Sequence, residues 1–307
     1  MNTPRAVPRA SPGAAAAAPA WRTVLGVFKL RIGVLIMLTA LAGIAATPNG
    51  TLAAWQVVLV ACAVLVSSAA AGAFNQLVEA DSDRRMARTR TRAFASGALR
   101  PGPRWHGLIA ALLAVAVAAT WAATNGLAAL FLAAGALTYA VVYTLLLKRR
   151  TSWNIVIGGA AGSFAVLTGA AAADPSLSPQ ALALALTLLL WTPPHFWSLA
   201  IACHDDYAAA GIPMLPVVVG IPRAARIVHG HACAMVAASM LPLLPWTGGS
   251  AGAAYAIGAI AGGAWLLLRT QALALEPKRP RAMAAFFASM VQLSLLIVGV
   301  AVDAALR

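Results

Sequence analysis

Long apolar runs, each about the length that crosses a lipid bilayer, most strongly constrain what this chain can fold into. They recur from residue 32 to residue 302, and no stretch between them is long enough to form a large soluble domain. Charged residues make up only 10% of the 307 positions, whereas a soluble domain carries roughly a quarter. The pattern therefore predicts an all-α polytopic membrane protein.

At roughly 20 residues per span, the runs predict a bundle of nine transmembrane helices in one domain, residues 24–307. The preceding residues 1–23 are basic and rich in Pro and Ala, without a continuous apolar core. We expect this segment to be a disordered cytoplasmic tail and not a signal peptide. The nine spans are expected at about residues 28–47, 55–78, 105–123, 126–147, 153–173, 179–201, 224–246, 250–268 and 284–304.

The distribution of basic residues indicates how the bundle is oriented. If the N-terminus is cytoplasmic, 21 of the 22 lysines and arginines fall on the cytoplasmic side, and only Arg307 falls outside. Because basic residues are retained on that side during insertion, an odd number of spans and a cytoplasmic N-terminus support each other. We expect a protein of the bacterial inner membrane. The formal charge of +14 is then mainly a topology signal and does not indicate nucleic-acid binding.

Small residues and tryptophans indicate how the helices pack and where the spans end. Residues 155–173 are rich in Ala and Gly, which predicts close helix approach inside the membrane. Several tryptophans lie near predicted span ends, as in an interfacial belt: Trp21, Trp55, Trp105, Trp121, Trp153 and Trp246. The three cysteines show no spacing typical of metal ligands.

A polar face is predicted where the second span ends. Asn75, Glu79 and Asp83 follow i, i+4, i+8 spacing, which aims an amide and two carboxylates in one direction on a helix, whereas Asp81 points elsewhere. Carboxylates at a membrane helix end are costly unless they are compensated. Mg²⁺ with substrate phosphates would compensate them, and the arginines at positions 84–92 suit the same phosphates. The alternative is a solvated loop in which the acids pair with neighbouring arginines.

A second acidic pair lies on the same predicted side of the membrane. Asp205 and Asp206 follow the sixth span, so five of the chain's eight carboxylates flank two membrane exits. Two such clusters around one cavity suit a diphosphate carried by more than one Mg²⁺. This is the chemistry of allylic diphosphate ionisation.

These residues carry a resemblance to a known family. The Asn75, Glu79 and Asp83 spacing resembles the NxxxDxxxD signature of the UbiA-type intramembrane prenyltransferases. Longer strings are similar to its protohaem IX farnesyltransferase (haem O synthase) branch, over about residues 24–304, and they lie at 81–89, 143–151, 154–159, 191–197, 205–207 and 211–216. The resemblance implies a nine-helix bundle whose polar cavity opens to the cytoplasm.

It also implies an activity and a set of site residues. A farnesyl group would pass from farnesyl diphosphate to a vinyl group of haem b, giving haem O, with Mg²⁺ as cofactor and haem as substrate. The protein would lie in the lipid bilayer and would not bind nucleic acid. Candidate protein partners are haem A synthase and a terminal-oxidase assembly. The implied metal ligands are Asn75, Glu79, Asp83, Asp205 and Asp206, and the four carboxylates among them are also the implied catalytic residues. The implied diphosphate contacts are Asn75, Arg88, Arg92, Lys148 and Tyr207.

His195 is the implied haem-binding residue. It follows Pro193 and Pro194, which are expected to interrupt the sixth helix and free carbonyl groups. His195 would ligate the haem iron or donate a hydrogen bond in the haem pocket. The alternative is a buried histidine that is hydrogen-bonded to a neighbouring carbonyl.

The chain departs from the family pattern in three places. Glu79 stands where the family usually has Asp, residues 29–31 read Lys-Leu-Arg in place of Lys-Pro-Arg, and residues 202–204 read Ala-Cys-His in place of Tyr-Arg-Lys. Two other functions stay open, and the departures at residue 79 and at residues 202–204 favour the second of them. One is a prenyltransferase for an aromatic acceptor such as 4-hydroxybenzoate, and the other is a haem-binding assembly factor that has lost catalysis.

Overall fold

The computed structural model describes residues 20–48, 50–245 and 251–307, and the regular elements in these ranges are all helices. Most of the predicted N-terminal tail and Trp246 lie outside the described residues. Residues 20–23, which the prediction assigned to the tail, begin the first helix. The longer helices are α1 (Ala20–Val27), α2 (Leu30–Ala45), α3 (Ala54–Val78), α5 (Pro103–Ala123), α6 (Gly126–Leu137), α8 (Ala160–Ala173), α9 (Pro179–Ala202), α12 (Ile221–Ser239), α13 (Ala253–Leu275) and α14 (Arg279–Ala305).

Shorter helices extend or connect these spans. They are α4 (Ala80–Arg84), α7 (Asn154–Gly158), α10 (His204–Ala209), α11 (Leu215–Val219), the π-helix η1 (Thr138–Leu147) and the 3-10 helix η2 (Leu241–Leu243). Within the described ranges, eight helices, some continued by a short neighbour, are long and apolar enough to cross a membrane. The pair α1 and α2, bent by 46°, supplies a ninth span when counted as one. The predicted all-α bundle of nine spans is confirmed.

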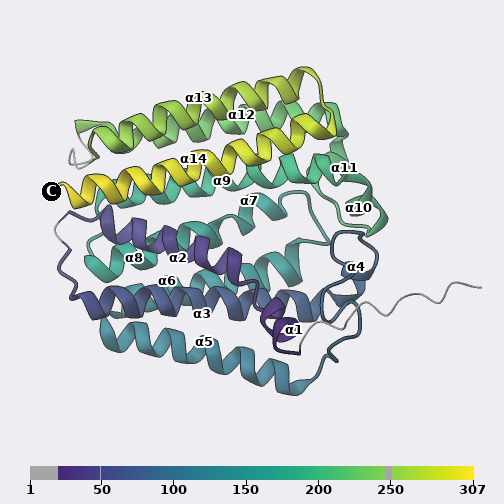
Figure 1. Ribbon diagram of the computed structural model, residues 1–307, viewed down its shortest axis with the longest axis horizontal. Coiled ribbons are helices and arrows are strands. Elements are labelled where there is room, and N and C mark those ends of the chain that lie inside the picture. The colour runs from purple at the N-terminus through teal and green to yellow at the C-terminus, as the bar shows by residue number, and fades with distance from the viewer. Residues whose placement is uncertain (1–19, 49, 246–250) are drawn as a thin grey trace, which may run out of the picture.

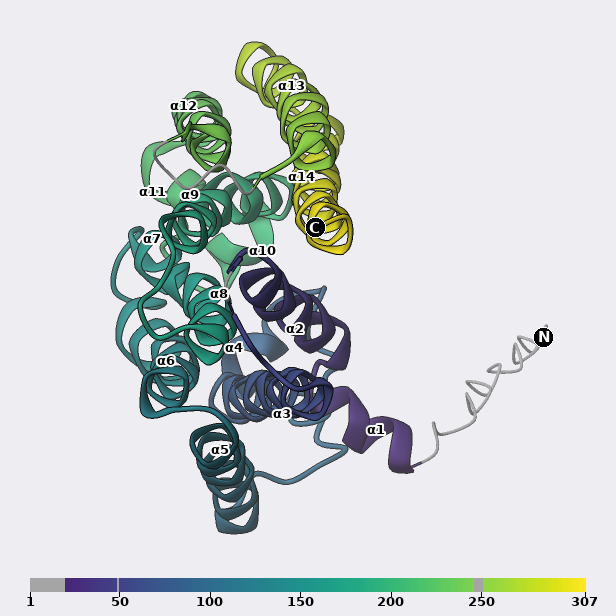
Figure 2. The same cartoon turned by 90° about the vertical axis from the view of Figure 1, so that its left-hand side faces the viewer.

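The spans form two packed groups (Figures 1 and 2). In one group α2 packs against α3 and α8, α3 against α5, and α6 against α8; in the other α9 and α13 pack against α12 and α14. Contacts of α8 with α9 and of α2 with α14 join the groups. The short helices α4, α10 and α11 gather at one end of the bundle, together with α1 and its break before α2 (Figure 1). We call this end the site face.

The break in the first span is centred on Lys29. This residue adopts a left-handed conformation with φ of 48°, which costs a residue other than glycine about 1–2 kcal/mol. The conformation ends α1 and turns the chain by 46° into α2. It also directs the Lys29 side chain to the end of α3, where its ammonium donates to Asn75.

Small residues bring α2 and α8 into backbone contact. A Cβ atom at Gly169 would lie 1.9 Å from the Ala40 carbonyl oxygen, and one at Gly43 would lie 2.1 Å from the Val166 carbonyl oxygen. No side chain fits at either position without separating the helices. The close approach expected from the Ala- and Gly-rich run is therefore present in this crossing.

The expected interruption of the sixth span is wrong. Helix α9 runs continuously through Pro193 and Pro194. The Ser198 hydroxyl donates to the Pro194 carbonyl oxygen at 2.6 Å, and the Thr192 hydroxyl donates to the Leu188 carbonyl oxygen at 3.0 Å. Membrane helices tolerate proline when side-chain hydroxyls and neighbouring helices satisfy the backbone around it.

The last two spans differ from their predicted boundaries. Helix α13 continues past residue 268 to Leu275, so Arg269 lies inside a helix and not in the connection. Its guanidinium stacks on the ring of Trp265 at 4.0 Å from the centroid, which lets the charge stay within the span. Helix α14 begins at Arg279, five positions before the predicted start, and therefore places Arg279 and Arg281 in its first turn.

A carboxylate far along the chain caps the start of α13. Asp303, near the end of α14, is 7% exposed and accepts backbone N–H bonds from Gly252 at 2.7 Å, Ala254 at 3.1 Å and Tyr255 at 3.0 Å. These N–H groups have no partner inside their own helix, so the carboxylate satisfies them and favours the helix dipole. The contact fixes α13 and α14 to each other at the end opposite the site face.

Candidate active site

The polar face predicted at the end of α3 is present and buried. Asn75, Glu79 and Asp83 are 1–2% exposed. The Glu79 N–H donates to the Asn75 carbonyl at 3.0 Å, and the Asp83 N–H donates to the Glu79 carbonyl at 2.8 Å, so i, i+4 register continues from α3 into α4. Asp81 points away, since it is exposed and paired with Arg84. Three oxygen-bearing side chains thus share one buried face.

Each carboxylate on this face is bonded to a basic side chain. The Lys148 ammonium lies 2.5 Å from Glu79 Oε2, with only 11% of the lysine side chain exposed. One guanidinium nitrogen of Arg92 donates to both carboxylate oxygens of Asp83, at 3.0 and 2.8 Å. Lys148 and Arg92, both predicted from the sequence as diphosphate contacts, therefore lie beside the predicted metal ligands.

Lys29 completes this cluster, and the sequence prediction missed it. Its ammonium donates to Asn75 Oδ1 at 2.5 Å and to the Tyr139 hydroxyl at 3.4 Å. The amide of Asn75 donates in turn to Thr144 Oγ1 at 3.1 Å. The available signal was the Lys-Leu-Arg string at residues 29–31, which shares its lysine with the family's Lys-Pro-Arg, but the direction of the side chain depends on the left-handed turn at that residue.

The π-helix η1 positions the side chains that face the cluster. In this segment the Lys148 N–H donates to the carbonyl of Tyr143, five residues back. Such wide turns are rare and occur often at functional sites. Tyr139 and Tyr143 stack with centroids 5.6 Å apart, and the Lys148 ammonium lies 5.6 Å from the Tyr143 ring. The turn therefore places two aromatic faces beside the basic groups.

The donor set of this cluster fits a hard divalent cation. Carboxylate and amide oxygens are the ligands that Mg²⁺ uses in proteins, usually together with substrate phosphates. Glu79 Oε1 is buried and has no hydrogen-bond partner among the described residues, and a buried carboxylate oxygen without a partner is costly. Three basic side chains, Lys29, Lys148 and Arg92, surround only two carboxylates. The surplus of donors suits an anionic ligand.

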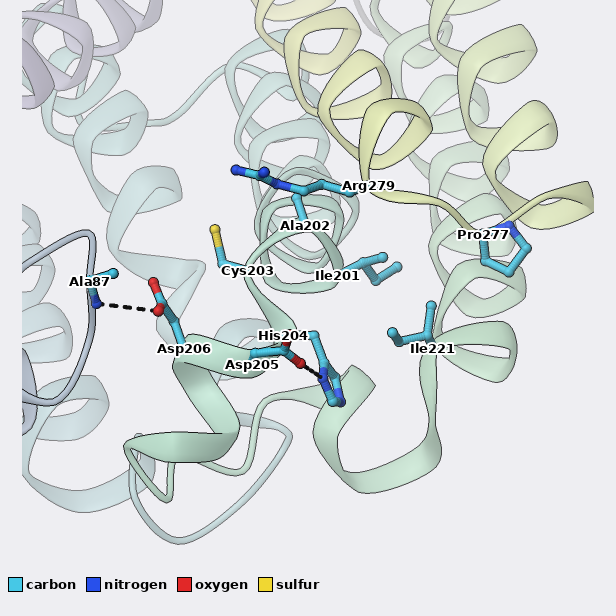
Figure 3. Close-up of a pocket in the computed structure, with 10 residues that line it drawn as sticks. All are labelled: Ala87, Ile201, Ala202, Cys203, His204, Asp205, Asp206, Ile221, Pro277 and Arg279. Carbon is cyan, nitrogen blue, oxygen red and sulfur yellow. Dashed lines mark hydrogen bonds and ion pairs between the residues drawn. The ribbon is translucent and has the colours of Figure 1, made fainter.

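The second acidic pair lies on α10, next to the α4–α5 connection. Asp206 accepts a hydrogen bond from the Ala87 N–H at 3.2 Å (Figure 3). Arg88 donates to the hydroxyl of the buried Tyr207 at 3.4 Å. Asp205 is fully exposed and pairs with His204 at 3.0 Å. Two successive residues after α4 thus meet two successive residues of α10, and the two acidic segments lie at the same end of the bundle (Figure 1).

The two acidic segments do not form one coordination group. The part of the chain that the structure describes contains no set of three or more His, Cys, Asp or Glu side chains placed to hold a metal ion. The carboxylates of Glu79 and Asp83 instead accept from basic groups, and that of Asp206 accepts from backbone. Asp205 extends into solvent. The five-ligand metal site implied by the resemblance stays a prediction.

A cavity of about 440 Å³ opens at the site face beside the second acidic pair (Figure 3). It is bounded by the end of α9, by α10, by the starts of α12 and α14, and by Ala87. Its lining residues are Ala87, Ile201, Ala202, Cys203, His204, Asp205, Asp206, Ile221, Pro277 and Arg279. The cavity therefore reaches the helix end that follows the WTPPHFW segment.

His195 lies on α9 in an aromatic cluster between α9 and α14. Its ring stacks on Trp191 and Phe286, with centroids 4.2 and 4.4 Å apart. Its Nδ1 atom lies 2.8 Å from the Ser289 hydroxyl, and that hydroxyl donates to the Phe286 carbonyl at 2.7 Å. Because a serine hydroxyl carries one hydrogen, it must accept from an Nδ1–H of His195. The lone pair of Nε2 is then free to accept a hydrogen bond or to ligate a metal.

Comparison with known sequences identifies the family. Residues 36–291 match the profile of the UbiA prenyltransferase family. The chain is 53% identical to Protoheme IX farnesyltransferase 2 of Paramagnetospirillum magneticum over 282 residues, which cover 92% of this chain and 96% of that protein. It is 42% identical to Protoheme IX farnesyltransferase 1 of the same organism, over 92% and 98% of the two chains. These matches run through both acidic segments.

Solved structures share the fold. A digeranylgeranylglyceryl phosphate synthase superposes with a TM-score of 0.76 at 17% identity, over 94% of this chain and 99% of the other. A UbiA homologue from Archaeoglobus fulgidus, bound to DMAPP and Mg²⁺, superposes with a TM-score of 0.64 at 16% identity, over 89% and 98%. The sequence match, the apolar spans and the common fold agree: this chain is an integral multi-pass membrane protein that belongs to the UbiA prenyltransferase family.

Proposed function

We propose that the protein transfers the farnesyl group of farnesyl diphosphate to a vinyl group of protohaem IX, giving haem O. The observation that carries this proposal is the 53% identity to Protoheme IX farnesyltransferase 2 over 92% of the chain. The site supports it, because a buried cluster of carboxylates and basic groups lies at the end of an apolar helix bundle. An isoprenoid diphosphate needs both surroundings, apolar for its tail and polar for its head.

The residues for the diphosphate end come from both acidic segments. Asn75, Glu79 and Asp83 would bind Mg²⁺ from one side of the diphosphate, and Asp205 and Asp206 would bind Mg²⁺ from the other side. The structures of the Archaeoglobus fulgidus homologue with Mg²⁺ and with Cd²⁺ are consistent with a divalent cation. When bound, the cation would neutralise charge on the diphosphate oxygens.

The chain's own basic residues stabilise the leaving group. As the C–O bond of farnesyl diphosphate breaks, negative charge grows on the diphosphate, and Lys148, Arg92 and Lys29 are already held around the cluster by hydrogen bonds. Preorganised donors need no reorientation in the transition state, which makes their contribution large. Arg88, held by Tyr207 at the adjoining segment, adds a fourth basic group.

Carbon–carbon bond formation completes the transfer. The vinyl carbon of protohaem attacks the allylic cation, a water oxygen adds to the resulting cation on the haem side chain, and that water releases a proton. The product carries a hydroxyethylfarnesyl group. The described spans exclude bulk water from the isoprenoid until the new bond forms, which limits hydrolysis of the allylic cation.

His195 is the proposed haem contact. Ser289 holds it as the Nδ1–H tautomer, so Nε2 can ligate the haem iron or accept a hydrogen bond from the haem pocket. Trp191 and Phe286 hold the ring between two aromatic faces. The aromatic surroundings suit a flat macrocycle, and the fixed ring suits a single mode of binding.

We place the site face in the cytoplasm of a bacterial inner membrane, with the N-terminus on the same side. This rests on the span layout predicted from the sequence, which assigns 21 of the 22 basic residues to that side. Arg269 is one of these, and the structure places it inside α13. Haem A synthase or a terminal-oxidase assembly would consume the product. A 4-hydroxybenzoate acceptor and an inactive assembly factor are less well supported, because the 53% and 42% identical relatives are both named for protohaem farnesylation.

Incubation of the purified protein with haem b, farnesyl diphosphate and Mg²⁺ tests the proposal, with haem O measured by mass spectrometry. Haem O should form with the wild type, and chelation of divalent cations should abolish it. Asp83→Ala should abolish turnover, whereas Asp81→Ala, which removes an exposed carboxylate two positions away, should not. Retained haem binding without product would instead indicate an assembly factor, and product with 4-hydroxybenzoate alone would indicate the other acceptor.

A further inference from the structure

The cavity beside Asp205 and Asp206 contains one permanently basic side chain among its ten lining residues, Arg279 at the start of α14. Its guanidinium end extends across Ala202 toward the Cys203 side of the cavity, away from Pro277 (Figure 3). Arg279 is about 75 positions along the chain from the acidic pair. Sequence spacing therefore gave no reason to place it in the site.

The basic neighbours of Arg279 form ion pairs within the protein, whereas the Arg279 side chain forms none with any described residue. Lys278 and Arg281 both pair with Glu276, and Arg281 also donates to the Ala272 carbonyl at 3.0 Å. The hydrogen bond from Lys278, with the charge of Arg281, lowers the pKa of the Glu276 carboxyl. Arg279 lies between these two residues, and its guanidinium has no hydrogen bond, ion pair or ring contact within the described ranges. Its donors are available to a ligand.

The charges of the cavity require a basic partner if an anion enters it. Asp205 and Asp206 repel an oxyanion, and residues 202–204, which precede them, include no lysine or arginine. His204 is paired with Asp205. Arg279 supplies the missing permanent charge from another helix, and guanidinium is the side chain best suited to bind planar or multi-oxygen anions.

Arg279 also lies in register with the aromatic cluster. Arg279 and Phe286 are seven residues apart on α14, and His195 and Ala202 are seven residues apart on α9. Seven residues are two turns, about 10.5 Å along each helix, so each pair shares one face. Phe286 stacks on His195, and Arg279 and Ala202 line the same cavity. The cavity and the aromatic cluster thus lie at two successive levels of the same α9–α14 interface.

We infer that Arg279 is a substrate-binding residue that receives an oxyanion in this cavity. The inference rests on the proposed function, and two of its substrates offer the required chemistry. One source is a diphosphate oxygen of the prenyl donor, and the other is a propionate carboxylate of protohaem. Both are anionic oxygen groups, and Arg279 binds either through charge-assisted hydrogen bonds.

Arg279→Gln tests this assignment, with Arg281→Gln as the matched control two positions further along α14, where the side chain points to another face of the helix. A charge-assisted hydrogen bond contributes about 1.5–3 kcal/mol, so its loss should weaken binding by about tenfold or more. KM for farnesyl diphosphate and KM for haem b are measured separately. A rise only for farnesyl diphosphate assigns the diphosphate, and a rise only for haem b assigns the carboxylate. Arg279→Lys, which keeps the charge but loses the planar fork, should recover part of the loss.

Changes below about twofold in both KM values for Arg279→Gln would overturn the inference, as would an equal loss in Arg281→Gln. Thermal unfolding in detergent shows whether either variant is destabilised. Equilibrium binding of each substrate alone is the second measurement. If the wild type forms no haem O, the proposed function fails, and the binding measurement still tests Arg279. Equal affinity of wild type and Arg279→Gln for both ligands would then refute the assignment.

Discussion

Replacing Lys148 with methionine should strongly destabilise the protein, because it leaves the buried carboxylate of Glu79 without its ionic partner. Glu79 is 1% exposed, its Oε2 atom accepts only from the Lys148 ammonium at 2.5 Å, and its Oε1 atom already lacks a partner among the described residues. Methionine retains much of the apolar length of lysine. The perturbation is therefore mainly the loss of charge and hydrogen bond.

The chain contains a second ion pair of the same length that lies in solvent. Arg84 and Asp81 are also 2.5 Å apart, but their side chains are 53% and 77% exposed. Breaking an exposed pair changes stability by about 0–1 kcal/mol, because water replaces the lost partner. Breaking a buried pair on one side costs about 3–5 kcal/mol, because the remaining charge cannot be hydrated. Lys148→Met should therefore cost about 3 kcal/mol more than Asp81→Asn.

Chemical unfolding in detergent micelles, followed by circular dichroism, measures this difference. A double variant, Lys148→Met with Glu79→Gln, should recover part of the loss, since an uncharged amide is cheaper to bury than an unpaired carboxylate. If the two substitutions lower the free energy of unfolding by amounts within about 1 kcal/mol of each other, burial does not strengthen the Lys148–Glu79 pair, and the prediction is refuted.

Three further outcomes are expected. Gly169→Ala should destabilise the protein by about 1–3 kcal/mol or more in the same assay, because the new methyl meets backbone, whereas Gly162→Ala on the same helix has nothing within 4 Å and should stabilise it by about 0.4–1 kcal/mol. Asp303→Ala should lower stability by about 1–2 kcal/mol, since three N–H groups at the start of α13 lose their acceptor; an unchanged midpoint would refute the capping role. His195→Ala should raise KM for haem b and leave KM for farnesyl diphosphate unchanged, and the reverse pattern in steady-state kinetics would exclude it as the haem contact.

Patterns set by the membrane could be predicted from sequence. Each span must satisfy its own backbone hydrogen bonds, so apolar length and charge position suffice to count helices. The shared face of Asn75, Glu79 and Asp83 follows from helical periodicity alone, and the register continues through the α3–α4 junction as expected.

Features that depend on backbone direction or on tertiary partners could not be predicted from the sequence. Lys29 reaches Asn75 only because its own φ is positive, and no local pattern specifies that turn. Pro193 and Pro194 stay inside α9 because hydroxyl groups and neighbouring helices compensate for them. Arg269 was placed outside its span because a charge usually marks an end, yet stacking on an aromatic ring keeps it inside.

Lys29 has two roles, because its backbone forms the left-handed turn and its ammonium donates to Asn75. Glycine there would relieve the backbone by about 1–2 kcal/mol, so a search for stabilising substitutions would favour it. That change would also remove the ammonium that donates to Asn75. Lys29→Gly should therefore turn over more slowly with little net gain in stability, because the buried amide oxygen of Asn75 loses its donor at a cost of about 1–3 kcal/mol. Backbone relief and the hydrogen bond to Asn75 oppose each other at this residue, so engineering there has to keep the ammonium group.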